Sequence, residues 1–296
     1  MLRPLLFLLA GLTAAQVAGW YGFPRLLYKT QAQPFEYRHK THADKSGASD
    51  CDGCHTLRPD GVFAGLPNTE SCAGCGACMT ACAAENNVAP GNSRATARTG
   101  LTPMLVHRVT RDGRTAFLPV TCMHCENETP CVTVCPQQAV ELDKATGIVT
   151  QMPQRCLGCR YCMTACAYHA RYFNWWDPEW SPGMERTLNP GVAVRMRGVV
   201  EKCNFCHGRL HESEDKAAAE GRDSINPADY RPACVEACAT HAITFGDLND
   251  PDSEVSIAAK SPEAFRLLAR LGTEPKIYYT SKREWVRDLA ERGPKS

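Results

Sequence analysis

The cysteines of this chain are its most informative residues, because sixteen of the eighteen fall into four blocks of four. Two blocks have the spacing C-x2-C-x2-C-x3-C, formed by Cys72, Cys75, Cys78 and Cys82 and by Cys156, Cys159, Cys162 and Cys166. The other two have a longer middle gap, formed by Cys122, Cys125, Cys131 and Cys135 and by Cys203, Cys206, Cys234 and Cys238. Three thiolates in a tight loop can bind three corners of a cubane 4Fe–4S cluster, and the fourth binds the other cluster of a pair. The spacing therefore predicts four clusters in two pairs.

Two other uses of cysteine fit this spacing less well. A disulfide framework suits a small secreted scaffold, but it has no reason to repeat the same x2 and x3 gaps four times. Structural zinc is bound by pairs of C-x2-C knuckles rather than by a third cysteine at x2 and a fourth at x3. Soft thiolates suit iron–sulfur clusters. The blocks are therefore interpreted as cluster ligands.

The four cysteine blocks lie within an internal sequence repeat. Residues 72–82 (CAGCGACMTAC) and 156–166 (CLGCRYCMTAC) match at eight of eleven positions, and a stretched block follows each of them. A two-block unit thus occurs twice. The glycines inside the tight blocks, Gly74 and Gly158, are expected to let the backbone pass close to a cluster.

Short helices and hairpins are expected to position the cysteines. Residues 105–120 and 139–150 alternate apolar and polar side chains around a glycine-containing turn, which predicts two hairpins. Residues 242–245 are expected to form a short strand. The charged segment HESEDKAAAEGRD, between Cys206 and Cys234, is interpreted as a solvated surface loop rather than a docking element. The fold class is α+β, built of small cluster-containing modules rather than one large hydrophobic core.

Composition excludes several functional classes. The formal net charge is only +1, with no basic stripe, so nucleic acid is not an expected partner. The chain has no glycine-rich phosphate loop, no nucleophile elbow and no zinc-protease helix motif. No catalytic residue is predicted, and a non-catalytic electron-transfer role is favoured.

The N-terminal region contains a nearly uncharged run, Leu5 to Phe23. Its length suits a transmembrane helix and also a signal peptide. Trp20 and Tyr21 near its end are typical of interfacial anchors, which favours an uncleaved anchor. We therefore expect the chain to be membrane-associated.

The remaining two cysteines, Cys51 and Cys54, form with His55 the sequence C-D-G-C-H, the attachment signature of c-type haem. His55 would be the proximal ligand, and His39, or alternatively His42, the sixth ligand. A disulfide or a further metal knuckle is the competing interpretation. Covalent haem attachment would place the chain on the periplasmic side of a bacterial inner membrane.

Several segments together resemble a known family. They are CGACMTACAAENNVAPG, LPVTCMHCENETPCVTVCP, RCLGCRYCMTACAYHARYFNW, EKCNFCHGRL and PACVEACATHAITFGDLNDPDSEVS. The chain resembles the four-cluster iron–sulfur subunits of molybdopterin oxidoreductases and their quinone-linked relatives, from about Glu70 to Tyr279. These include subunits of dimethyl sulfoxide, polysulfide and formate-dependent nitrite reductases and of periplasmic quinone reductase complexes.

The resemblance implies which cysteines share a cluster. One pair of clusters would be held by Cys72, Cys75 and Cys78 with Cys238, and by Cys203, Cys206 and Cys234 with Cys82. The other pair would be held by Cys122, Cys125 and Cys131 with Cys166, and by Cys156, Cys159 and Cys162 with Cys135. It also implies tandem ferredoxin-like modules, each holding two 4Fe–4S clusters.

The expected domain organisation follows from these features. Residues 1–30 are the anchor or signal segment, 31–69 the haem segment, 70–250 the four-cluster domain and 251–296 a C-terminal extension. Within the cluster domain, residues 70–120 and 200–250 hold one cluster pair, and residues 121–199 hold the other.

Three functions are compatible with this organisation. The first is an electron-transfer subunit docked on a polytopic quinone-reactive membrane protein and served by a c-type cytochrome. The second is an iron–sulfur subunit serving a molybdopterin-family catalytic subunit. The third is a freestanding polyferredoxin, which the apolar N-terminus disfavours.

Two smaller features are open to two interpretations each. His124 and His207 adjoin cysteine blocks, so they either hydrogen-bond cluster sulfur or pack in loops. Aromatic residues after the third block are interpreted as core or subunit interface rather than as a quinone pocket, and they are Tyr172, Phe173, Trp175, Trp176 and Trp180.

Overall fold

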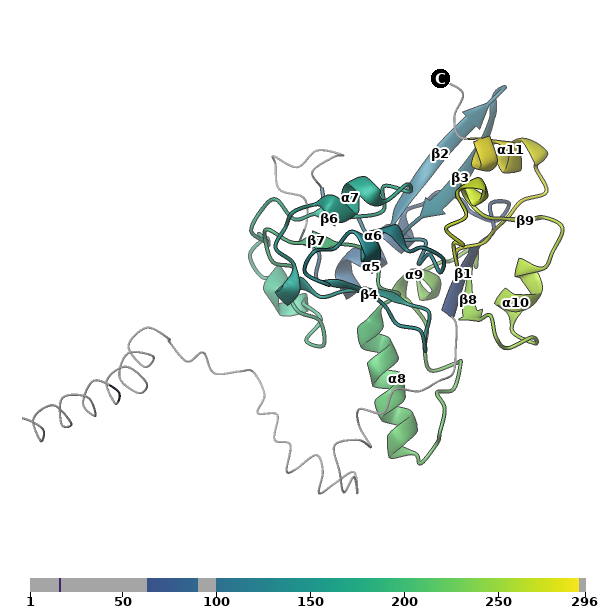
Figure 1. Cartoon of the computed structure of the whole chain (residues 1–296). Coiled ribbons are helices and arrows are strands. Elements are labelled where there is room, and N and C mark those ends of the chain that lie inside the picture. Colours follow the sequence, from purple (N-terminus) through teal and green to yellow (C-terminus); the bar gives the residue numbers. More distant parts are fainter. Residues whose placement is uncertain (1–15, 17–62, 90–99, 293–296) are drawn as a thin grey trace, which may run out of the picture. The chain divides into compact units, whose positions relative to one another are not determined.

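The structure is a computed structural model that describes Gln16, residues 63–89 and residues 100–292. The chain divides into two compact units, Met1–Asp50 and Cys51–Ser296, and every element described below belongs to the second (Figure 1). Apart from Gln16, the proposed anchor Leu5–Phe23 lies outside the described residues. Within the described part of the chain, no helix combines the length and apolar character needed to cross a membrane.

Most of the helices are short, and four of them carry parts of the cysteine blocks. These four are α5 (Ala77–Glu85), α6 (Pro130–Thr133), α7 (Tyr161–Ala165) and α9 (Ala233–Glu236). The other α-helices are α8 (His207–Ala219), α10 (Glu254–Ala259) and α11 (Glu284–Arg292). Single 3₁₀ turns are η2 (Pro153–Arg155), η3 (Met184–Thr187) and η4 (Ala269–Leu271).

The described strands form two-stranded antiparallel sheets only. They pair as β1 (Phe63–Pro67) with β8 (Ile243–Asp247), β2 (Leu105–Arg111) with β3 (Arg114–Val120), β4 (Val140–Leu142) with β5 (Val149–Gln151), β6 (Tyr172–Phe173) with β7 (Val200–Glu201), and β9 (Ala264–Phe265) with β10 (Tyr279–Thr280). The prediction of small helices and hairpins is confirmed.

The expected hairpins are present with the expected turns. Asp112 and Gly113 connect β2 to β3 with φ of 51° and 73°. Positive φ at both central residues is what a two-residue type I′ turn requires, and Asp-Gly tolerates it best. The hairpin expected over residues 139–150 is β4 and β5, and the strand expected over 242–245 lies in β8.

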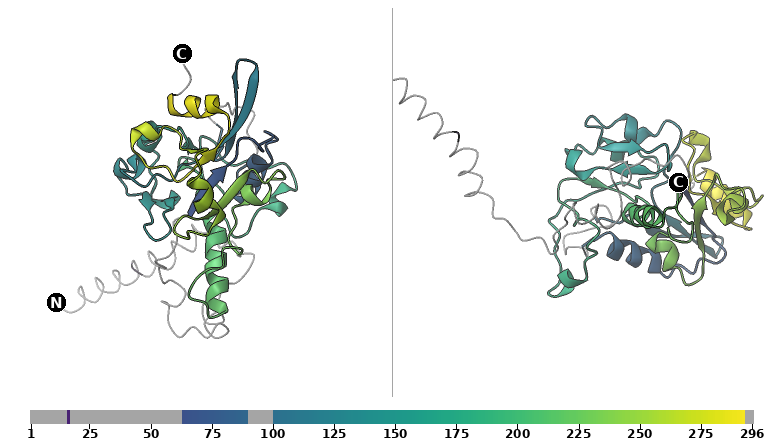
Figure 2. Two further views of the ribbon diagram at one scale, coloured as in Figure 1. Left: turned by 90° about the vertical axis from the view of Figure 1, so that its right-hand side faces the viewer. Right: turned by 90° about the horizontal axis from the view of Figure 1, so that it is seen from below.

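One expectation is wrong. The segment interpreted as a surface loop begins as α8, a helix of 13 residues that extends away from the other elements (Figures 1 and 2). Its Glu, Lys and Ala residues are strong helix formers. Leu210, Ser213 and Ala217 are spaced by three and four residues and are buried on one face.

The fold draws on segments outside residues 70–250. Strand β1 pairs with β8 along its whole length, from Phe63 opposite Asp247 to Pro67 opposite Ile243. The C-terminal residues 251–292 add α10, η4, α11 and the β9–β10 pair. Residues 63–69 and the C-terminal segment are therefore integral to the packing around the cysteine blocks.

Two pairs of short helices bring cysteine blocks from the two copies of the repeat together. Helix α5 of the first block packs against α9 of the fourth, and α6 of the second block packs against α7 of the third. Blocks distant in sequence are thereby brought together as first with fourth and second with third. We call these the first–fourth module and the second–third module.

A hydrophobic core joins the modules to the terminal segments. It contains Phe63 of β1, Met123 of the second block, Phe205 of the fourth block and Leu210 of α8. The C-terminal segment adds buried apolar residues to the same core, namely Phe265, Ile277, Tyr279, Trp285, Val286 and Ala290. The interior is thus not built from the cysteine sites alone.

Two neighbouring tyrosines test whether the C-terminal segment stabilises this fold. The hydroxyl of Tyr279 is buried and donates a hydrogen bond to the Pro119 carbonyl at 2.9 Å, whereas Tyr278 is half-buried. Tyr279→Phe leaves a buried acceptor unpaired, so we expect a loss of about 1–3 kcal/mol in the free energy of unfolding. Tyr278→Phe should change it by less than about 0.5 kcal/mol. Denaturant unfolding of cluster-loaded protein measures both, and equal effects would contradict the integral role of this segment.

Candidate metal centres

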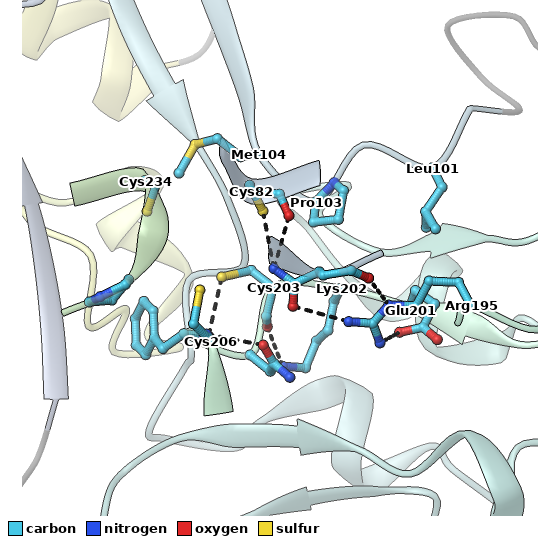
Figure 3. A pocket seen from close by; sticks show the side chains of 14 residues that line it. Cys82, Leu101, Pro103, Met104, Arg195, Glu201, Lys202, Cys203, Cys206 and Cys234 are labelled. Carbon is cyan, nitrogen blue, oxygen red and sulfur yellow. Dashed lines mark hydrogen bonds and ion pairs between the residues drawn. The ribbon is translucent and has the colours of Figure 1, made fainter. Parts of the chain in front are cut away.

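Three of the four cysteine sets implied by the resemblance surround a common space. The spaces measure about 420, 410 and 300 Å³, part of each being open to solvent. Their cysteines are Cys82 with Cys203, Cys206 and Cys234, then Cys122, Cys125 and Cys131 with Cys166, and finally Cys156, Cys159 and Cys162 with Cys135. Figure 3 shows the first of these sites. In each, three cysteines of one block meet the fourth cysteine of another.

The remaining set is also brought together. The thiol of Cys72 interacts electrostatically with those of Cys75 and Cys238, and the thiol of Cys78 with those of Cys72 and Cys238. All sixteen cysteines of the four blocks are free thiols. The structure therefore places every predicted cluster ligand in a set of four.

A recurring backbone conformation shapes the loops. The residue before the second cysteine of each block has positive φ: Gly74 at 68°, His124 at 45°, Gly158 at 76° and Phe205 at 55°. At Gly158 an added Cβ would lie 2.3 Å from the Gly198 carbonyl oxygen, and at Gly74 it would lie 2.4 Å from the ring of Phe117. Glycine is needed at these two positions because of backbone conformation and protein packing.

Backbone N–H groups point at several cysteine sulfurs. Ala139 N–H donates to Cys135 Sγ and Ala242 N–H to Cys238 Sγ, both at 3.2 Å. Longer contacts join Phe205 N–H to Cys203, Val200 N–H to Cys156 and Ala233 N–H to Cys206, at 3.4 to 3.5 Å. Hydrogen bonds to sulfur stabilise thiolates and tune the reduction potential of a bound cluster.

The electrostatics of the sites fit a cationic occupant. Burial, with help from neighbouring thiols, raises the pKa of Cys125 to about 12 and those of Cys78 and Cys206 to about 11. Four thiolates facing one another in a largely dry space therefore require a compensating positive charge, and metal coordination deprotonates thiols for this reason. Among the described residues, no three His, Cys, Asp or Glu side chains are placed to hold a single metal ion. Four cysteine thiols around a common space are the ligand set of a 4Fe–4S cluster, so the residues fit this group.

The four sites follow one another as a chain. The Cys234 thiol interacts with Cys78, which connects the two sites of the first–fourth module. The Cys203 thiol interacts with Cys122, which connects the two modules. In the second–third module, the Arg171 guanidinium interacts with both Cys131 and Cys162 and so connects the two sites there.

The junction between the modules contains a stacked pair of rings. His124 and Phe205, which occupy the same position in the second and fourth blocks, stack with centroids 3.8 Å apart. His124 is fully buried, and its Nδ1 accepts a hydrogen bond from Val149 N–H at 3.0 Å. Burial, and then the charge of Lys202, holds the pKa of His124 well below its ordinary value, so the ring is neutral. The Nε2 atom of His124 is buried and has no hydrogen-bond partner in the chain, so donation to cluster sulfur and loop packing both stay open for this residue.

His207 begins α8 and packs edge-on against His211, with centroids 4.3 Å apart. Burial, and then His211, lowers its pKa. Its ring packs against His211 of the same helix, and both interpretations of His207 stay open.

Three buried cations near the second–third module were not predicted from the sequence. Lys202 donates to the carbonyls of Val149 and Cys203, and Lys276 donates to the His124 carbonyl at 3.1 Å. Arg171 follows the third block and donates to the Gln151 side chain. The only signal in the sequence was that Arg171 and Lys202 lie close to cysteine blocks. Exposed cations can lie equally close to such blocks, so this signal does not identify buried ones.

The aromatic segment after the third block is half-buried. The Arg160 guanidinium lies 5.3 Å from the Phe173 ring centroid and 4.9 Å from that of Trp175. Beside the same block, Leu157 is 57% and Tyr161 66% exposed. An apolar surface therefore adjoins the site formed by Cys135 and the third block.

The predicted haem ligands Cys51, Cys54, His55, His39 and His42 lie outside the described residues, so the haem stays a prediction.

Comparisons with known proteins agree with the cysteine sites. The family described as "4Fe-4S dicluster domain" matches residues 114–181. The iron–sulfur cluster-binding subunit of menaquinone reductase from Nitratidesulfovibrio vulgaris is 50% identical over 229 residues, covering 75% of this chain and 89% of the relative. A protein of Halobacterium salinarum named as an iron–sulfur subunit of dimethyl sulfoxide reductase is 40% identical over 71% of this chain and 75% of its own length. Protein NrfC of Escherichia coli is 36% identical over 75% and 82%.

Paired substitutions test whether each cluster takes three cysteines from one block and its fourth cysteine from another. If Cys135 completes the site of the third block, Cys135→Ala and Cys156→Ala each disturb the same cluster, and the double variant should disturb only that one. Cys135→Ala combined with Cys122→Ala should disturb two clusters. Electron paramagnetic resonance with iron analysis counts the altered clusters. The reverse pattern would mean that each block binds its own cluster.

Proposed function

Because this chain belongs to the family of 4Fe–4S iron–sulfur subunits of quinone-linked and molybdenum-type oxidoreductase complexes, we propose that it relays single electrons through four clusters between a cytochrome or catalytic subunit and a quinone-reactive membrane subunit. The observation that carries this proposal is the unbroken order of the cysteine sites, in particular the electrostatic interaction of the Cys203 thiol with the Cys122 thiol between the modules. A subunit that only stored metal would not need its two modules to be so close.

The 4Fe–4S clusters would supply reversible one-electron carriers at the four sites. The chain's own residues bind them through thiolates, restrict water, and offset their negative charge with N–H groups and buried cations. No side chain in these sites is needed to move a proton or form a bond. The chain therefore acts as a conductor, and the chemistry of substrates belongs to its partners.

The number of four clusters is part of the proposal. The matched family region, residues 114–181, contains the eight cysteines of the second–third module. The first–fourth module has the same set of three cysteines plus one at each site. This equivalence supports two further clusters there.

An N-terminal anchor and one c-type haem complete the proposed pathway. The run from Leu5 to Phe23 and the C-D-G-C-H sequence support them, with His55 as the proximal ligand and His39 or His42 as the sixth ligand. Covalent haem would place the subunit on the periplasmic side of the membrane.

The proposed partners fit the surface of the second–third module. Exposed Leu157 and Tyr161 lie in the block that forms the last site of the chain. Exposed apolar side chains grouped beside a site are typical of protein interfaces. We propose that a quinone-reactive subunit docks here. We further propose that the quinone is menaquinone, because the relative from Nitratidesulfovibrio vulgaris is named as a subunit of menaquinone reductase. Service to a molybdopterin-family subunit is the second candidate, supported by the relative named as a dimethyl sulfoxide reductase subunit.

Purification from detergent-solubilised membranes tests the function and the haem together. We expect a polytopic membrane subunit to co-purify, and menaquinol-linked electron transfer to be abolished by Cys122→Ala, which removes a ligand in the middle of the chain of sites. The denatured chain should retain haem that stains for peroxidase activity.

The matched control is Cys54→Ser, which should remove the stain and leave the cluster signals intact. A chain recovered without membrane partners, with unchanged electron transfer in Cys122→Ala, would contradict the proposed function. A stain-negative wild-type chain, made with functional haem-attachment machinery, would contradict the haem.

A further inference from the structure

The second–third module contains a buried guanidinium, that of Arg171, whose donors are not all used within the protein. Arg171 directly precedes β6, and Lys202 directly follows β7. Since Tyr172 pairs with Glu201 in the antiparallel β6–β7 ladder, Arg171 and Lys202 flank the same end of it. Side chains alternate between the two faces of a strand, so these two cations occupy the face opposite to Tyr172 and Glu201.

The donors of Arg171 are incompletely satisfied within the protein. The residue is only 3% exposed, and Nη2 donates to Gln151 Oε1 on β5. Its Nε and Nη1 atoms are buried and make no hydrogen bond of ordinary geometry within the chain, although the guanidinium interacts with the Cys162 thiol. Leaving charged donors buried and unpaired is costly. A partner is therefore expected in the space that Arg171 lines.

That space belongs to the cysteines. Arg171 lines the same space as Cys122, Cys125, Cys131 and Cys166. The thiolates of Cys131, Cys162 and Cys122 together hold the pKa of Arg171 above its ordinary value, although burial acts against its charge. The guanidinium thus lies between the two cysteine sets of the module.

The neighbouring charges leave an excess of positive charge. Glu201 is paired with Arg195 at 3.1 Å, and exposed Glu126 lies 3.8 Å from Lys276. Lys202 makes its hydrogen bonds to carbonyl oxygens. Arg171 and Lys202 therefore remain without a carboxylate of their own next to the clusters.

We propose that Arg171 raises the reduction potentials of the clusters in the second–third module. Its unpaired Nε–H and Nη1–H groups would donate hydrogen bonds to cluster sulfur. A reduced cluster carries one more negative charge than an oxidised one. A fixed cation and N–H donors in a site of low dielectric stabilise the reduced form more. An electron exchanged between a cluster held here and its neighbour in the first–fourth module would move in either direction without a proton or a bond.

The inference rests on cluster binding by this module and is independent of the proposed partners. Redox titration monitored by electron paramagnetic resonance, on full-length protein with its iron content measured, tests it. Arg171→Gln should make reduction of the clusters of this module at least tenfold less favourable. This corresponds to a fall in reduction potential of about 59 mV for a one-electron couple. Arg171→Lys, which keeps the charge but loses the planar fork, should give a smaller shift in the same direction.

Two further variants keep the test decisive. Gln151→Glu places a carboxylate against the guanidinium without removing it, so the potentials should also fall, even if Arg171→Gln does not load its clusters. Arg155→Gln removes an exposed charge immediately before Cys156, where solvent screens it, and should leave the potentials unchanged. Unchanged potentials in Arg171→Gln or in Gln151→Glu at full iron content, or an equal fall in Arg155→Gln, would overturn the inference while leaving the electron-relay function intact.

Discussion

The crowding of four cysteine thiols into each site constrains the rest of the structure. Burial raises the pKa values of Cys125 and Cys206, because ionised thiolates in a dry space lose hydration and repel neighbouring thiolates. Only a bound cationic group makes the ionised sets stable. Since each set takes its fourth cysteine from a different block, the occupant of a site also joins two distant parts of the chain. Folding and metal binding are thereby coupled in this protein.

This coupling explains why the elements are so small. Helices of four or five residues, such as α6, α7 and α9, cannot be stable by themselves. They are held by cysteine sites at their ends and by the core that Phe63, Met123, Phe205 and the C-terminal segment form. Backbone N–H groups that a longer helix would use internally are directed at sulfur instead, as at Ala139 and Ala242. The irregular backbone is therefore part of the cysteine sites.

Local pattern predicted the parts of the fold whose causes are local. The Asp112–Gly113 turn and the alternation around it were sufficient for the β2–β3 hairpin, and cysteine spacing was sufficient to group the ligands into blocks. Strand β1 was not predicted because its short FAGLP segment contains Gly and Pro and its partner β8 lies far along the chain. Helix α8 was interpreted as a loop because its charged residues suggested exposure to solvent, although its residues are strong helix formers.

The same distinction between local and long-range causes applies to the site. The crossed sets of cysteines came from the family resemblance, and the structure is what places them together. Phe205 and His124 adopt the same positive φ as Gly74 and Gly158 without being glycine, which no sequence rule indicates. Arg171 was missed because a single arginine after a cysteine block has the same appearance whether it is buried or exposed.

The two modules are proposed to hold four clusters in one continuous order, with the neighbouring thiols of Cys203 and Cys122 at the middle. Iron anomalous scattering from crystals of the loaded protein measures this directly. Four cluster peaks are expected in a chain, besides the single iron of the proposed haem, with the two inner clusters at Cys82/Cys203/Cys206/Cys234 and Cys122/Cys125/Cys131/Cys166. Iron in the second–third module alone, or four peaks with these two sites not adjacent, would contradict it.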